Sequence, residues 1–282
     1  MSLRNVLAGL TCCFMPTAAL AEAKTDKSSY WLFHPTPEKE MRDLSTDRPD
    51  KTESPYTVDA GHYQIETDLA IVSSDKSDQG IRTTWTSLLV SNLKVGLTNG
   101  IDLQAIISPS ISQRVETPDG TDRTYGRGDT LIRMKFNLIG NDGGDWALGV
   151  MPFAQIPSHT NELGSDRVEG GVIMPVAISL PGEWDLGTMA QFNWAKNAED
   201  DQMHGEYVGT LTIGHNIWGD LAGYLEFFSQ NSDESGAKWV ATVDTGLTYG
   251  ATPNVQLDMG INVGVTEAAD DLNPFVGISA RL

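Results

Sequence analysis

Apolar and polar side chains alternate with a period of two along most of the chain, starting near residue 61. In the first such segment Tyr63, Ile65, Leu69 and Ile71 are apolar, and polar residues stand between them. This alternation places one face of a β-strand in an apolar environment and the other face in water. The pattern predicts twelve strands, at residues 60–72, 84–96, 101–113, 128–139, 145–156, 168–180, 184–195, 206–217, 220–230, 238–249, 254–265 and 273–282.

Short and long connections alternate between these predicted strands. The five short ones contain turn residues, as in Thr98-Asn99-Gly100 and Trp218-Gly219-Asp220. The six long ones are polar, and they comprise residues 73–83, 114–127, 157–167, 196–205, 231–237 and 266–272. An even number of strands with short turns at one end and longer loops at the other is typical of bacterial outer-membrane barrels. The first and last connections are both long, which predicts both termini at the short-turn end.

Aromatic residues near the strand ends agree with this arrangement, because barrels carry aromatic girdles at both membrane interfaces. The residues near short turns are Trp146, Trp184 and Trp218, and those near long loops are Trp85, Trp194, Tyr207 and Trp239. A soluble β-sandwich with tryptophans in its core is the alternative, but it does not explain the alternating loop lengths. The sequence therefore predicts an all-β protein, a transmembrane antiparallel up-and-down β-barrel of about 12 strands formed by residues 60–282.

The first 59 residues divide into two segments. Residues 1–21 form a predicted signal peptide with an apolar stretch and cleavage after Ala21, which predicts export to the cell outer membrane. Both cysteines, Cys12 and Cys13, lie in it, so the exported chain has no thiol for catalysis or metal binding. Residues 22–59, the leader, are rich in proline and charged residues, and their apolar and polar residues show no regular period. We expect the leader to be either a periplasmic segment or a plug in the lumen.

Charge and motifs exclude several classes of function. The 282-residue chain has 19 basic and 38 acidic residues, and its net charge of −19 argues against a nucleic-acid partner. Neither a Gly-x-Ser-x-Gly nor a His-Glu-x-x-His motif is present. His159 and His204 fall in predicted long loops, where solvated histidines are common. We therefore expect no enzyme, catalytic residue, cofactor or metal, and an outer-membrane hydrolase is the least favoured alternative.

One run in the leader carries a family resemblance. The run consists of Thr46, Asp47, Arg48, Pro49, Asp50, Lys51, Thr52, Glu53, Ser54 and Pro55. It leads directly into the first predicted strand and resembles the opening motif of a family of outer-membrane transporter-like barrels named after the meta-pathway of phenol degradation. The resemblance covers about residues 44–282. It implies a barrel that passes aromatic or other small compounds across the outer membrane, and it brings no catalytic residues.

The polar faces of the predicted strands would line the lumen. The charged candidates on them are Glu66, Asp68, Lys94, Arg133, Lys135, Glu226, Asp244, Asp258 and Arg281. Arg133 and Lys135 are two residues apart on one strand, so both side chains point to the same face. An acidic wall opposite a basic patch would create a transverse field of the kind that orients solutes in channels.

These observations predict a channel or transporter for passive passage of small molecules, including aromatic or hydrophobic ones, through a polar lumen. A structural or surface-interaction barrel without transport is the alternative. The expected partners are outer-membrane lipid and lipopolysaccharide, a small-molecule solute and the outer-membrane assembly machinery.

Overall fold

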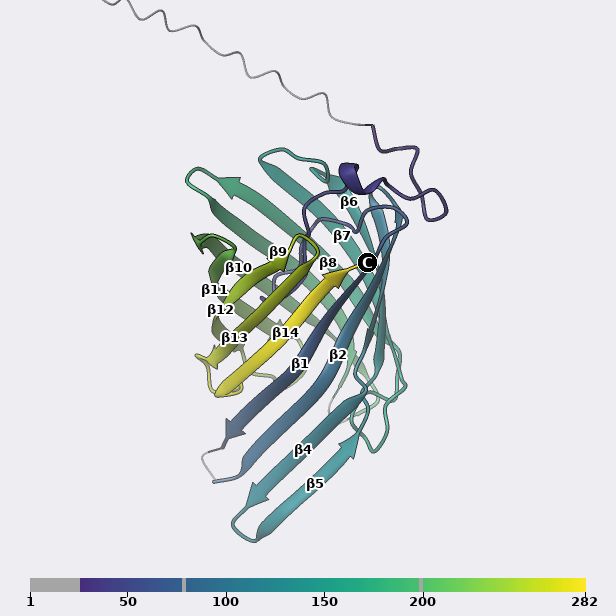
Figure 1. The fold of residues 1–282 in the computed structure, drawn as a ribbon. Coiled ribbons are helices and arrows are strands. Elements are labelled where there is room, and N and C mark those ends of the chain that lie inside the picture. The colour runs from purple at the N-terminus through teal and green to yellow at the C-terminus, as the bar shows by residue number, and fades with distance from the viewer. Residues whose placement is uncertain (1–25, 78–79, 198–199) are drawn as a thin grey trace, which may run out of the picture.

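The structure, a computed structural model, describes residues 26–77, 80–197 and 200–282, so the predicted signal peptide lies outside the described residues. A short 3₁₀ turn at Glu38–Glu40 precedes fourteen strands (Figure 1). The strands are β1 (Tyr63–Lys76), β2 (Arg82–Thr98), β3 (Ile101–Ile107), β4 (Ser110–Thr117), β5 (Gly120–Gly126), β6 (Thr130–Ile139), β7 (Trp146–Ile156), β8 (Glu169–Leu180), β9 (Trp184–Lys196), β10 (Met203–Trp218), β11 (Leu221–Ser232), β12 (Val240–Thr252), β13 (Val255–Gly264) and β14 (Leu272–Arg281). Within the described residues, no helix has the length and apolar character needed to cross a membrane.

The sheet closes on itself. β1 pairs antiparallel with β2 on one side and with the last strand, β14, on the other. From β6 to β14 each strand pairs antiparallel with the next, and β6 joins β3. Counting β3 and β4 as one interrupted strand, and β5 and β6 as another, twelve strands form the wall. The predicted antiparallel barrel is therefore confirmed.

The wall has its apolar side chains outside and its polar side chains inside. In β10, Leu211 and Ile213 are exposed, whereas Thr210 and Thr212, which alternate with them, are buried. In β11, Phe227 is exposed and its neighbour Glu226 is 1% exposed. A hydrocarbon surround accounts for this inverted arrangement, because it accepts apolar side chains and requires every backbone polar group to be paired internally.

The predicted third strand, 101–113, is interrupted, and here the prediction of a long loop at 114–127 was wrong. β3 ends at Ile107, and Pro109, which cannot donate a ladder hydrogen bond, stands before β4. β2 pairs with β3 near the short turns and with β4 near the long loops. β4 then pairs with β5, so most of the predicted loop is a hairpin that extends the wall at the long-loop end (Figure 1).

Most of the predicted girdle residues lie on the outer surface. Trp146, Trp184, Trp194, Tyr207, Trp218 and Trp239 are all exposed. Trp85 differs, because its register partner in β1 is the buried Ser73, which faces the lumen. Assigning Trp85 to the outer girdle was therefore wrong. β1 has a register irregularity against β14 between Asp68 and Ala70, and next to it Leu89 of β2 has a φ of 58°. At this point the alternation of faces shifts by one residue.

Both ends of the described chain lie near the short turns. The backbone N–H of Arg281 donates to the carbonyl of Asn254 in the β12–β13 turn (2.9 Å). At the start of the leader, Lys27 pairs with Asp142 in the β6–β7 turn (3.2 Å). In Figure 1 the leader, drawn in purple, enters the barrel at the end opposite to the β4–β5 hairpin. The loop pattern predicted this arrangement.

Candidate functional site: the leader within the lumen

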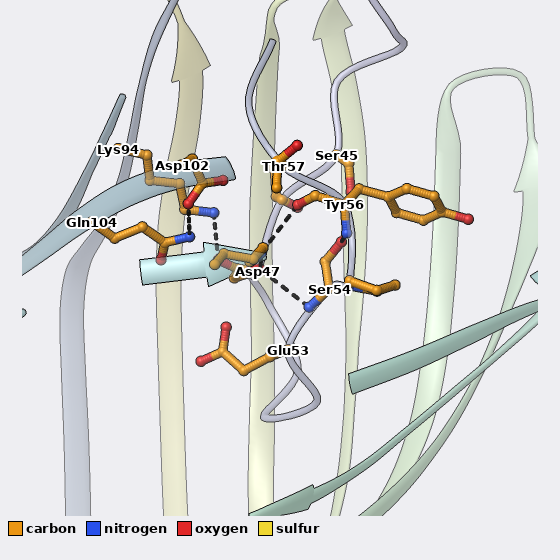
Figure 2. A network of polar contacts seen from close by, with 12 residues as sticks. Ser45, Asp47, Glu53, Ser54, Tyr56, Thr57, Lys94, Asp102 and Gln104 are labelled. Atoms are coloured by element: carbon orange, nitrogen blue, oxygen red, sulfur yellow. Dashed lines mark hydrogen bonds and ion pairs between the residues drawn. The ribbon is translucent and has the colours of Figure 1, made fainter. Parts of the chain in front are cut away.

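The leader runs into the barrel, and residues 45–58 contact the inward faces of strands around the wall. Asp47 is the centre of this contact (Figure 2). Its carboxylate pairs with Lys94 of β2 (2.5 Å), with Lys135 of β6 (2.5 Å) and with Arg133 of β6 (3.1 Å). Its backbone N–H donates to Glu66 of β1 (3.0 Å). One leader residue thus joins β1, β2 and β6.

Two leader cations pair with acidic side chains of the wall. Arg48 pairs with Asp258 of β13 (2.6 Å) and with Asp68 of β1. Lys51 pairs with Asp244 of β12 (3.1 Å). The leader therefore places an anion against the basic part of the wall and cations against its acidic part.

The remaining residues of the run support this placement. Thr52 donates to Glu226 of β11 (2.5 Å), and Glu53 pairs with Arg133. The side chain of Thr46 accepts a hydrogen bond from Gln256 of β13 (3.1 Å). Within the leader, the N–H of Ser54 donates to the Asp47 carboxylate (3.1 Å), which closes a loop that orients this carboxylate. Pro55 is fully buried, and its carbonyl accepts from Asn137 (3.0 Å).

At the short-turn end, Arg42 fixes the entry of the leader. Its guanidinium pairs with Asp59 (3.3 Å) and with Asp142 (3.0 Å). Arg281 of β14 donates to the carbonyl of Arg42 (2.6 Å). Burial acts to raise the pKa of Asp142, but hydrogen bonding to Asn99 and the charge of Arg42 outweigh it and hold that pKa below its usual value. The Asp142 carboxylate therefore remains a charged partner for the leader.

The structure places all nine of the lumen candidates chosen from the sequence against the leader. The sequence reasoning missed the neutral side chains that take part, such as Gln104 and Asn141, because only charged residues were chosen. It also missed Arg42 and Asp59. Gln104 and Asn141 stand on or next to predicted strands, so hydrogen-bonding capacity on the polar face could have indicated them. Nothing in the aperiodic leader singled out Arg42.

Cavities remain on both sides of the leader. One of about 240 Å³ lies toward the long-loop end, and its lining includes Asp50, Arg133 and Phe275. A second, of about 570 Å³, lies toward the short turns and is lined by Tyr56 and Leu186 among others. A third, of about 710 Å³, surrounds the entry of the leader at Arg42. The lumen is therefore divided by the leader but not filled by it.

Gly96 of β2 allows the leader backbone to approach the wall. A Cβ at this position would meet the backbone of Asp59 and stand 2.7 Å from the carbonyl oxygen of Val58. We expect Gly96→Ala to lower the free energy of unfolding by about 1–3 kcal/mol, because neither backbone can move without breaking pairing. Gly209→Ala, in β10 with no atom within 4 Å of the added Cβ, is the matched control. Thermal unfolding followed by gel mobility measures both, and equal stability of the two variants would contradict a close leader–wall contact.

The two loop histidines have local partners. His159 lies in the loop after β7, where its Nδ1 is 2.9 Å from the Asp129 carboxylate. Burial acts to raise the pKa of Asp129, but hydrogen bonds from the N–H groups of Ser158 and Ser165 and from His159 hold it below its usual value. The loop assignment of His204 was wrong, because it lies in β10, is buried and contacts Asn197 (3.0 Å). Among the described residues, no three His, Cys, Asp or Glu side chains are grouped to hold a metal.

A closed antiparallel wall with an apolar exterior and a charged interior defines an outer-membrane β-barrel. The sequence profile of the family described as "Putative MetA-pathway of phenol degradation" matches residues 46–282, and the chain belongs to this family. The match begins at the first residue of the leader run that carried the resemblance.

Solved structures agree with the fold. The COG4313 outer membrane channel from Pseudomonas putida F1 is 14% identical, with a TM-score of 0.60, over 84% of this chain and 100% of that chain. The β domain of the Bordetella autotransporter BrkA is 12% identical, with a TM-score of 0.51, over 78% of this chain and 99% of that chain. At these identities the likeness concerns the fold alone. No curated protein sequence matches this chain.

Proposed function

We propose that the protein is an outer-membrane channel for passive passage of small molecules and that the leader is a plug that controls the lumen. The observation that carries the proposal is the placement of residues 45–58 across a polar lumen with cavities on either side. The leader is held by ion pairs and hydrogen bonds to the wall rather than by an apolar core. Water can replace polar contacts of this kind. Opening a path for a solute along the leader therefore requires less free energy than opening one through a packed apolar core.

The chemistry of the cavity toward the long loops supports small molecules with both an apolar and a polar part. Ile71, Ile106 and Phe275 line it next to Arg133. A ring could contact the apolar side chains while a hydroxyl or carboxylate reaches the guanidinium. The family name points to phenol degradation, and compounds of this type have that combination of groups.

A structural barrel without transport is the second candidate, and the density of ion pairs around Asp47 favours it. Lys94, Arg133 and Lys135 all pair with this one carboxylate, which ties the wall together across the lumen. If the barrel is sealed, substitutions of these residues should change its stability alone. If it is a channel, they should also change its conductance.

Single-channel recording of Arg133→Ala in planar bilayers tests the proposal. We expect the full chain to conduct in small discrete steps and Arg133→Ala to shift selectivity toward cations, because a positive charge beside the cavity is removed. Lys238→Ala is the control, since Lys238 lies in a long loop and pairs with the exposed Glu267 (3.0 Å). A folded barrel that passes neither ions nor a small phenolic solute would overturn the channel proposal.

A further inference from the structure

The outer face of the wall carries an unusual set of charges where β1, β2, β4 and β5 extend toward the long loops. The strand register identifies this face. Leu272 of β14 is exposed on the outer surface and pairs with Ser74 of β1, which pairs with Thr84 of β2. Thr84 in turn pairs with Arg114 of β4, and Arg114 pairs with Arg123 of β5. Directly paired residues share a face, so both arginines point outward.

The next set of paired residues on the same outer face, across β1, β2 and β4, adds two more cations. Lys76 of β1 pairs with Arg82 of β2, and Arg82 pairs with Glu116 of β4. All four basic side chains are exposed. The carboxylates near them are Glu116, which pairs with Arg114, and Asp271, which accepts the backbone N–H of Lys76 (3.2 Å). The face therefore has an excess of positive charge in a chain whose acidic residues outnumber its basic ones by two to one.

The arrangement places like charges directly opposite each other twice, Lys76 with Arg82 and Arg114 with Arg123. Side chains in such positions have Cβ atoms about 4.5–5.5 Å apart, and like charges there are destabilising. An anion bound between them would remove this repulsion. Two guanidinium groups side by side suit a phosphate, which accepts bidentate hydrogen bonds from arginine.

The height of the cluster identifies the source of the phosphate. Below it on the same strands, Leu88, Leu93 and Leu69 are exposed on the outer surface. A tilted strand crosses the hydrocarbon in about 9–11 residues. Counted from Tyr63, this length ends close to Ser74, which lies in the row of the two arginines. The cluster thus stands just above the apolar surface, at the headgroup level of the leaflet on the long-loop side.

We propose that Lys76, Arg82, Arg114 and Arg123 form a binding site for the phosphorylated headgroup of a glycolipid in the outer leaflet. The acyl chains would lie along the leucines below, and the phosphates would lie between the paired cations. The site rests on the orientation of the barrel, with its long loops at the cell surface, and not on conduction through the lumen. Its test is therefore independent of the channel proposal.

The experiment measures binding of bis-phosphorylated lipid A to the full mature chain in detergent, by native mass spectrometry. We expect the double variant Arg114→Gln/Arg123→Gln to bind the lipid more weakly than the unchanged chain. Each of the two substitutions should weaken binding by about tenfold or more, because each removes a charge-assisted contact. Lys76→Gln/Arg82→Gln is expected to act in the same direction. Lys238→Gln, which removes an exposed loop cation away from this face, is the matched control and should bind like the unchanged chain.

Two further binding measurements test whether the phosphates of the lipid are the groups that the site recognises. Lipid A without phosphates should bind the unchanged chain as weakly as the double variants bind the phosphorylated form. Inorganic phosphate should compete poorly, because it lacks the acyl chains that contact the leucines. Equal binding of the phosphorylated lipid to the unchanged chain and to both double variants, with folded barrels on gels, would overturn the proposal. Equal binding of lipids with and without phosphates, or displacement by inorganic phosphate alone, would also overturn it.

Discussion

A chain lacking residues 22–59 is expected to conduct ions in discrete steps several-fold larger than those of the full mature chain. The reason is geometric, because residues 45–58 cross the lumen between the cavity beside Phe275 and the cavity beside Tyr56. Removing the leader joins these cavities into one water-filled path. It also leaves the basic residues of β6 and the acidic residues of β12 and β13 facing each other across water, which screens them.

Planar-bilayer recording of the two chains measures this effect, and heat-modifiable gel mobility shows that each has folded. A synthetic peptide of residues 26–59, added from the short-turn side, is the control. It should reduce the large steps if the leader itself is what blocks them. Unchanged steps after deletion, or silence of a folded barrel, would show that something other than the leader limits the lumen.

Asp47→Ala is expected to cause the largest loss of stability of any single leader substitution. The change leaves Lys94, Arg133 and Lys135 close together in the lumen without the carboxylate that all three contact. Removing one partner of a buried ion pair typically costs about 3–5 kcal/mol, because the remaining charges are left uncompensated. Water that enters the lumen after the leader detaches would reduce this cost, so the lower end of the range is expected.

The measurement is thermal or denaturant unfolding, with Glu38→Gln as the matched control, since Glu38 is an exposed leader carboxylate. Asp47→Asn should lose nearly as much stability as Asp47→Ala, because the amide keeps the shape but not the charge. Conductance should increase in both Asp47 variants as the leader loosens. A loss no larger than that of Glu38→Gln would mean that the three wall cations do not depend on Asp47.

The strand pattern was predicted well because it depends on local physics. Successive side chains of a barrel strand face lipid and the lumen in turn. Apolar and polar residues therefore alternate along each strand with a period of two. The errors fall where the period is interrupted. Pro109 divides β3 from β4, and the change of alternation near Leu89, which has a positive φ, turns Trp85 inward. A one-residue shift reverses the face of every later side chain in a strand, and the sequence alone does not show where it occurs.

The sequence by itself determined the barrel, the alternation of turns and loops, the charged faces of the strands and the family motif in the leader. Only the tertiary structure decided where the leader lies and which charges meet. Arg48 and Asp258, for example, are 210 residues apart. The leader sequence has no hydropathy period, so its surroundings could not be predicted from the pattern of its residues. Its position depends on charges that only the closed wall brings together, because β1, β2, β6, β12 and β13 surround one lumen.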